Sequence, residues 1–248
     1  MSDSSFEGLV ADSLRKANIP FVRNSPVGGL RADFLISTQD GKKLVLEAKD
    51  TNLTPNSFSR ASNQVKLYKR ATGAHSAAFV VPKGTKADPD KGIVSASKLV
   101  NYITERFGEG LELPKKEVAP SKNIFCVMPF AGIYEDTYYA MAGAAKSNGA
   151  VADKVDRDDF QGDIVAEVEK RIRGSAAVIA DLSESKPNVL YEVGFSHALG
   201  RPTIHICSTP LDQLPFDVRN WNTLPYVLGQ TKRLESALTP KVKSILTR

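Results

Sequence analysis

In the first half of the chain, the spacing of hydrophobic positions changes from one segment to the next. Apolar residues recur at helical spacing near the start, and two short apolar runs then flank an Asp-Gly pair, which is a strong signal for a β-hairpin. The elements predicted for this half are a helix over residues 4–17, strands over 32–37 and 42–49, a basic helix over 55–73, a strand over 75–82 and a helix over 94–107. A loop containing Pro26, Gly28 and Gly29 is expected after the first helix. The order α-β-β-α-β-α predicts a mixed α/β core of roughly 100 residues.

The second half alternates strands with helices. Its predicted strands cover residues 123–130, 149–156, 176–183 and 202–208. Its predicted helices cover 134–149, 162–175, 188–200 and 231–246, the last interrupted near Pro240. Gly149 and Gly200 are expected to end two of these helices. This alternation implies right-handed βαβ units and a parallel sheet, which binds ligands at the carboxyl ends of its strands.

A change of composition separates the halves. Residues 107–123 contain two Gly, two Pro and scattered charges without a sustained period. We therefore predict a first domain over residues 1–110, a linker over 111–122 and a second domain over 123–248. Both cysteines, Cys126 and Cys207, stand in apolar runs and are expected to be buried thiols. With no apolar run of about 18 residues and no basic segment at the start, a cytoplasmic protein with no membrane association is the simplest expectation.

Charge is distributed unevenly between the halves. Residues 1–120 carry 18 Lys and Arg against 13 Asp and Glu, whereas residues 121–248 carry 15 of each, so the net charge of +5 lies in the first half. This bias fits a polyanionic partner for that half. An excess of five positive charges is also common in proteins that bind no nucleic acid.

The hairpin places charged residues together at a strand end. A two-residue turn at Asp40-Gly41 would put Asp33 opposite Ala48, and a three-residue turn would put it opposite Glu47. Either register brings Asp33 within one residue of Glu47, and Lys49 shares a strand face with Glu47. Two adjacent carboxylates suit Mg²⁺ or Mn²⁺, which would activate water while Lys49 stabilises developing charge. The alternative is a solvated hairpin end with a surface ion pair.

The sequence around this hairpin resembles the PD-(D/E)xK nuclease superfamily over residues 4–107. The matching residues, in chain order, are Glu7 on the first helix, Asp33, Glu47 and Lys49 on the hairpin, and Gln64 and Tyr68 on the basic helix. The Pro that often precedes the Asp is replaced by Ala32. The resemblance implies Mg²⁺- or Mn²⁺-dependent hydrolysis of DNA with Asp33 and Glu47 as metal ligands and Lys49 as catalytic partner. It further implies that Glu7 assists the metal or the fold and that Gln64 orients the nucleic acid or a neighbouring group.

Basic residues on the 55–73 helix are the candidate contacts to DNA phosphates. They are Arg60, Lys66, Lys69 and Arg70. Binding through them would depend on salt concentration. The alternative is an ordinary solvated helix face, and His75, at the start of the next strand, is expected to have no chemical role.

In the second half, acidic and amide side chains lie around one strand-to-helix connection. Asp181 ends a predicted strand, Asn188 is positioned to cap the next helix, and Glu192 follows within that helix. They form either a ligand site at the mouth of the sheet or a capped helix whose dipole favours a nearby Glu.

These pieces resemble the nucleoside 2-deoxyribosyltransferase-like group, related in fold to TIR domains, over residues 123–230. The resemblance rests on "CVMPF", "ADLSESKPNVLYEVGFSHALGRP" and "PFDVRNW". It implies a flavodoxin-like sheet flanked by helices, Glu192 acting at a ribose anomeric carbon, and Asp181 positioning the substrate. Asn188 stands where active transferases often have Asp. The implied base side of the nucleotide pocket is Met128, Pro129 and Phe130, with Asp158, Asp159 or Gln161 reaching in from a loop, and His197 is expected to be structural.

Three functions are compatible with these patterns. The preferred one is a prokaryotic anti-phage effector: a Mg²⁺-dependent DNA endonuclease controlled by a nucleotide bound to the second domain, acting as a homodimer or larger homo-oligomer. The second is a glycosidase acting on NAD or a nucleoside, or a deoxyribosyltransferase, with Glu192 as nucleophile and a first domain that only binds nucleic acid. The third is a DNA-binding module without catalysis, against which the intact set of Asp33, Glu47 and Lys49 argues.

Overall fold

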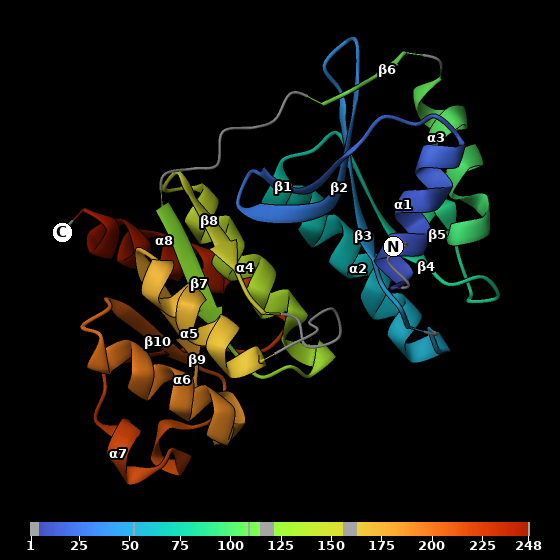
Figure 1. Ribbon diagram of the computed structural model, residues 1–248. Coiled ribbons are helices and arrows are strands. Elements are labelled where there is room, and N and C mark those ends of the chain that lie inside the picture. Colours follow the sequence, from blue (N-terminus) through green and yellow to red (C-terminus); the bar gives the residue numbers. More distant parts are fainter. Residues whose placement is uncertain (1–4, 52, 109, 115–121, 156–162, 248) are drawn as a thin grey trace. The chain divides into compact units, whose positions relative to one another are not determined.

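The chain forms two compact units, residues 1–118 and 119–248, which we describe separately. The structure is a computed structural model that describes residues 5–51, 53–108, 110–114, 122–155 and 163–247 (Figure 1). Both units are α/β, as the sequence predicts.

The first unit is built on a mixed sheet. Its elements are α1 (Phe6–Lys16), β1 (Val22–Val27), β2 (Leu30–Thr38), β3 (Lys43–Ala48), α2 (Pro55–Thr72), β4 (Ser76–Val81), η1 (Pro89–Lys91), β5 (Ile93–Ser95), η2 (Ala96–Lys98), α3 (Leu99–Phe107) and β6 (Leu111–Glu112). The strands run in the order β1-β2-β3-β4-β5, and β6 pairs with β2. Pairing is antiparallel among β1, β2 and β3 and parallel from β3 to β5. The predicted mixed core is therefore confirmed.

Two segments of this unit differ from the sequence prediction. The loop expected after the first helix contains strand β1, whose Val27 pairs with Leu30 across a Gly28-Gly29 turn. Gly28 has φ +61°, a conformation that glycine adopts without the steric penalty of other residues. The closing helix begins only at Leu99, because residues 93–95 pair with β4 as strand β5.

Helices cover both faces of the first sheet. On one face, apolar residues of α1 and α3 pack with alternate residues of β2, β3 and β4 into a single core. On the other face lies α2, which contacts β2, β4 and β5. Figure 1 shows α2 on one side of the sheet and α1 and α3 on the other. With both faces covered, most side chains of β2 and β3 are buried, and a charged residue there needs a specific reason.

The second unit is a parallel sheet of five strands. Its elements are β7 (Lys122–Val127), η3 (Gly132–Tyr134), α4 (Glu135–Lys146), β8 (Ala150–Asp153), α5 (Ile164–Gly174), β9 (Ala177–Asp181), η4 (Ser183–Ser185), α6 (Pro187–Ala198), β10 (Thr203–Cys207), η5 (Leu211–Gln213), α7 (Phe216–Arg219), β11 (Thr223–Pro225) and α8 (Thr231–Leu246). The strand order β11-β10-β9-β7-β8 is the flavodoxin-like order 2-1-3-4-5. The order of strands reverses between β7 and β9, where such folds bind ligands.

Two details of this unit correct the prediction. Helix α8 continues through Pro240 instead of breaking there. Leu234, Leu238 and Val242 recur every four residues and are all buried, so packing against α4 offsets the hydrogen bond that proline removes. Strand β11 was not predicted because three residues are too few to show a period.

Cys126 and Cys207 are buried free thiols, as expected. Gly149 and Gly200 follow α4 and α6 with positive φ angles of 66° and 64°. Among the described residues, no helix combines the length and the apolar composition that crossing a membrane requires.

Candidate functional sites

The hairpin between β2 and β3 brings two carboxylates together. Phe34 pairs with Leu46, so the next antiparallel step places Asp33 opposite Glu47. The Asp33 Oδ2 atom also accepts a hydrogen bond from the Ala48 backbone N–H at 2.8 Å. Of the two registers that the sequence allows, the structure therefore has the one with a three-residue turn, in which Asp33 faces Glu47.

Asp33 lies within its strand and not at the strand's start. Strand β2 begins at Leu30 because β1 pairs along it, with Ser25 opposite Ala32 and Val27 opposite Leu30. Strand β1, which was expected to be a loop, thus extends β2. Because β1 and β3 flank β2, Asp33 has backbone on both sides.

Lys49 completes the charged cluster. Its Nζ atom lies 2.8 Å from Glu47 Oε1, and the two side chains are only 23% and 18% exposed. The ammonium also lies 5.5 Å from the centroid of the Phe79 ring on the neighbouring strand. Glu47 and Lys49 therefore share the strand face that the spacing predicts, in a setting drier than an exposed hairpin end.

Burial raises the pKa of Asp33 well above its ordinary value, and the negative charge of Glu47 raises it further. The Ala48 N–H and the charge of Lys49 act in the opposite direction but do not cancel this rise. Without a bound cation, Asp33 and Glu47 therefore resist being ionised together.

Glu7 is held by a basic partner that the sequence analysis missed. Arg23 on β1 donates from Nη2 at 2.6 Å and from Nε at 3.1 Å to Glu7 Oε1. Glu7 is close enough to raise the pKa of Asp33 slightly. Because β1 was expected to be a loop, no sequence signal pointed to Arg23.

Gln64 and Tyr68 lie on the buried face of α2, as their spacing predicts. The Tyr68 hydroxyl donates to the Leu46 backbone carbonyl at 3.4 Å, and its ring is fully buried. Since α2 runs back along β3, Gln64 lies one turn toward the carboxyl end of β3, the end that carries Glu47 and Lys49.

The basic residues of α2 are more exposed than Gln64. Arg60, Lys66 and Lys69 are exposed, and Arg70 is partly exposed. They form a positive surface on α2, whereas Gln64 is only 8% exposed. His75 instead accepts a hydrogen bond from the Lys43 N–H through Nδ1, a structural role.

The first unit offers two carboxylates for a metal ion. In the described part of the chain, no group of three or more His, Cys, Asp and Glu side chains converges on one point. A metal ion held there would need further ligands from water and substrate, which is the ordinary arrangement for Mg²⁺.

The second unit has a pocket of about 200 Å³ near the carboxyl ends of β7 and β8, beside the switch in strand order. Four of the residues predicted to bind a nucleotide line it, namely Met128, Pro129, Phe130 and Glu192. The remaining lining residues are Phe125, Cys126, Glu135, Lys154, Val155 and Val168. Asp158, Asp159 and Gln161 lie outside the described residues.

Asp181 does not line this pocket and is fully buried. Its Oδ1 accepts hydrogen bonds from the Ser183 N–H at 3.0 Å and the Ser183 hydroxyl at 2.5 Å, and its Oδ2 accepts one from the Tyr226 hydroxyl at 2.6 Å. Burial raises the pKa of Asp181 although these donors lower it. Through these hydrogen bonds, Asp181 connects the turn after β9 with the segment after β11.

Asn188 does not cap helix α6. The helix begins one residue earlier at Pro187, Lys186 is the N-cap residue, and no side chain caps it. Proline at the first helical position starts the helix without a side-chain cap, because its fixed φ suits the helix. Asn188 is also absent from the pocket lining, and Glu192 lies in the second turn rather than the first.

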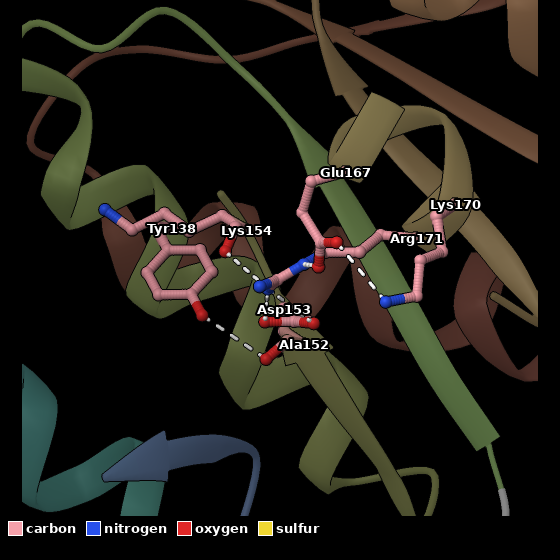
Figure 2. Close-up of polar contacts among 7 residues, drawn as sticks. All are labelled: Tyr138, Ala152, Asp153, Lys154, Glu167, Lys170 and Arg171. Atoms are coloured by element: carbon pink, nitrogen blue, oxygen red, sulfur yellow. Dashed lines mark hydrogen bonds and ion pairs between the residues drawn. The ribbon is translucent and has the colours of Figure 1, made fainter. Parts of the chain in front are cut away.

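Two charged residues in the pocket were not found from the sequence. Lys154, which follows β8, lies with Nζ 2.5 Å from Glu135 Oε1 at the start of α4. Beside them, Arg171 donates from Nη1 to both Asp153 oxygens at 3.0 and 3.1 Å and from Nε to Glu167 at 2.8 Å (Figure 2). The Lys154–Glu135 and Arg171–Asp153 contacts join residues from separate elements, so local spacing gives no signal for them; only Arg171 and Glu167 lie at i,i+4 spacing on one helix.

Comparison with known proteins does not assign a function to the chain. No family model matches the chain, and a comparison with curated proteins finds no significant match. Function must therefore be argued from the two sites.

Proposed function

We propose that the first unit is a divalent-metal-dependent DNA endonuclease. The observation that supports this most is the pairing of Asp33 and Glu47 across β2 and β3, with Lys49 ion-paired to Glu47 in a largely buried setting. A solvated hairpin end would not need to hold these charges away from water.

The two carboxylates fit a hard divalent cation. Asp33 has a raised pKa because burial and Glu47 disfavour its charge, and a cation between the two would offset that repulsion. Carboxylate oxygens are the ligands that Mg²⁺ and Mn²⁺ prefer, so Asp33 and Glu47 would hold the ion. Such an ion lowers the pKa of a bound water and neutralises charge on a phosphate.

The remaining residues would position the reactants. Lys49 is within reach of Glu47 and would orient the attacking water or stabilise charge that develops on the phosphate. Gln64, buried one turn from Tyr68, would orient a group at the same strand end. Glu7 is held by Arg23, which favours a role in fixing α1 against β1.

Phosphate contacts are assigned to the exposed basic residues of α2. Arg60, Lys66 and Lys69 are exposed and Arg70 is partly exposed, so a phosphate can reach all four side chains. Binding through them is expected to weaken steeply with salt, since each phosphate contact releases counterions.

The test is cleavage of supercoiled plasmid with Mg²⁺ or Mn²⁺ over a panel of nucleotides. Lys49→Ala is expected to abolish cleavage, whereas Lys42→Ala, which removes an exposed lysine of the same hairpin, should leave it unchanged. If wild type and Lys49→Ala leave the plasmid equally intact with every ligand, the nuclease proposal fails.

We further propose that a nucleotide bound in the second unit controls this activity, as in a prokaryotic anti-phage effector. Its support is the pocket at the switch in strand order, which is lined by apolar residues such as Met128 and Phe130 and by the carboxylate of Glu192. Control requires that the nucleotide favour one state of the protein over another, in assembly or in access to the nuclease. Light scattering with and without each nucleotide would detect the expected change in a homodimer or larger oligomer.

A second activity is favoured by one observation. Glu192 and Glu135 line the same pocket, so a carboxylate is available to attack the anomeric carbon of NAD or of a nucleoside. Release of free base that survives Lys49→Ala but disappears in Glu192→Gln would assign glycosidase or transferase activity to this unit, with the first unit binding nucleic acid.

A further inference from the structure

A pair of histidines joins helix α6 to strand β10 in the second unit. The Nε2 atoms of His197 and His205 lie 3.1 Å apart, and their rings are nearly perpendicular at 87°. Trp221 stacks on His205 at a centroid distance of 4.6 Å and meets the edge of His197 at 4.5 Å. His197 is exposed, so the pair lies at the surface. Neither ring belongs to the nucleotide pocket.

Both imidazoles are neutral at physiological pH. Burial and the neighbouring His197 lower the pKa of His205 to about 4, and burial lowers the pKa of His197. Among the described residues, no carboxylate is hydrogen-bonded to either ring to favour a positive charge. One Nε2 therefore donates to the other, and the neutral form is the one that binds metal ions.

The spacing of the two nitrogen atoms suits a transition-metal ion. With Zn–N bonds of about 2.0–2.1 Å, two ligands of a tetrahedral ion lie roughly 3.3 Å apart, close to the observed separation. Imidazole nitrogen suits Zn²⁺, Cu²⁺ and Ni²⁺, whereas Mg²⁺ takes oxygen ligands. The pair is thus chemically distinct from the carboxylates of the first unit.

We propose that His197 and His205 bind a Zn²⁺-class transition-metal ion through both Nε2 atoms. The described residues place no group of three His, Cys, Asp and Glu side chains there, so water completes the coordination. On binding, the proton between the two Nε2 atoms moves to the unprotonated Nδ1 of the donor ring. At a pH where both imidazoles are neutral, metal binding therefore releases no net proton. The ion would fasten α6, which carries Glu192 five residues before His197, to β10.

Trp221 is a built-in reporter, because it is the chain's one tryptophan and contacts both rings. We would treat the chain of 248 residues with a chelator, add excess Mg²⁺ to occupy oxygen-ligand sites, and titrate Cu²⁺ or Ni²⁺ while recording fluorescence. The expected result is saturable quenching at one ion per chain, reversed when excess chelator removes the quencher.

Variants locate the binding. His197→Gln and His205→Gln are each expected to weaken the quenching affinity at least tenfold, whereas His75→Gln, which changes the third histidine of the chain in the other unit, should leave it unchanged. His197 is exposed, so its variant tests the site even if replacing the buried His205 disturbs folding, which circular dichroism would show. Quenching that does not saturate, or that is equal in wild type and His197→Gln, overturns the proposal.

Discussion

The hydrogen bond between Tyr226 and Asp181 provides a sharp test of how the second unit is stabilised. Tyr226→Phe removes one hydroxyl and leaves the ring in place. The Asp181 carboxylate is fully buried, and it then loses the donor at 2.6 Å that serves Oδ2. A buried hydrogen bond to a charged group contributes about 1.5–3 kcal/mol, so we expect the free energy of unfolding at pH 7 to fall by that amount.

The loss should depend on pH in a defined direction. The folded pKa of Asp181 is already raised above 3.8 by burial, and the Tyr226 hydroxyl holds it down, so Tyr226→Phe raises it further. Below 3.8, Asp181 is protonated in folded and unfolded protein, and only a neutral hydrogen bond of about 1 kcal/mol is lost. The difference between variant and wild type therefore grows as pH rises through the folded pKa of Asp181.

Urea denaturation followed by Trp221 fluorescence measures this in the second unit. Tyr191→Phe is the matched control, because the Tyr191 hydroxyl also donates to a carboxylate at 2.6 Å, that of Glu169, but on an exposed surface. We expect the control to change the unfolding free energy by less than about 0.5 kcal/mol. Equal losses in the two variants, or a loss in Tyr226→Phe that is the same at pH 3.5 and pH 7, would refute the reasoning.

Three further perturbations test other parts of the chain by urea denaturation, followed by circular dichroism for the first unit because the chain's one tryptophan lies in the second. In metal-free protein, Asp33→Asn should be more stable than wild type at pH 7, and this gain in stability should vanish below pH 3.8. The reason is that the raised pKa of Asp33 in the folded state makes wild-type stability decline as pH rises. A gain in stability that does not depend on pH contradicts this. Gly28→Ala should lower the free energy of unfolding by at least about 2 kcal/mol, since the added Cβ would lie 2.3 Å from a backbone oxygen. Gly84→Ala, also at positive φ but in open space, should lower it by only about 1–2 kcal/mol. Arg171→Gln should lower the free energy of unfolding by about 1–3 kcal/mol, because it leaves the largely buried carboxylate of Asp153 without this partner. Lys170 is 80% exposed, so Lys170→Gln should lower the free energy of unfolding by less than about 0.5 kcal/mol.

Much of the first site could be predicted because its geometry is local. Asp33, Glu47 and Lys49 lie on one hairpin, so turn length and the two-residue period of strands limit their arrangement to two registers. The spacing of Gln64 and Tyr68 places them on one helix face for the same reason. Arg23 could not be found, because it approaches Glu7 from a strand that the sequence shows only as a Pro- and Gly-containing segment.

The second site was less predictable because it is assembled from the ends of separate elements. Glu192 and the segment from Met128 to Phe130 line one pocket, since strand ends in a parallel sheet meet at one edge. Asp181 satisfies the same rule yet faces Tyr226, and only three-dimensional packing decides between a ligand and an internal hydrogen bond.

By itself the sequence determined the α/β class, the division into two different sheets and the residues on each strand face. These follow from hydrophobic periods and turn residues, which act over a few positions. The tertiary structure alone decided the pairing of Arg23 with Glu7, of Lys154 with Glu135, and of His197 with His205. Such contacts depend on how elements distant in the chain pack together, and no local period records that.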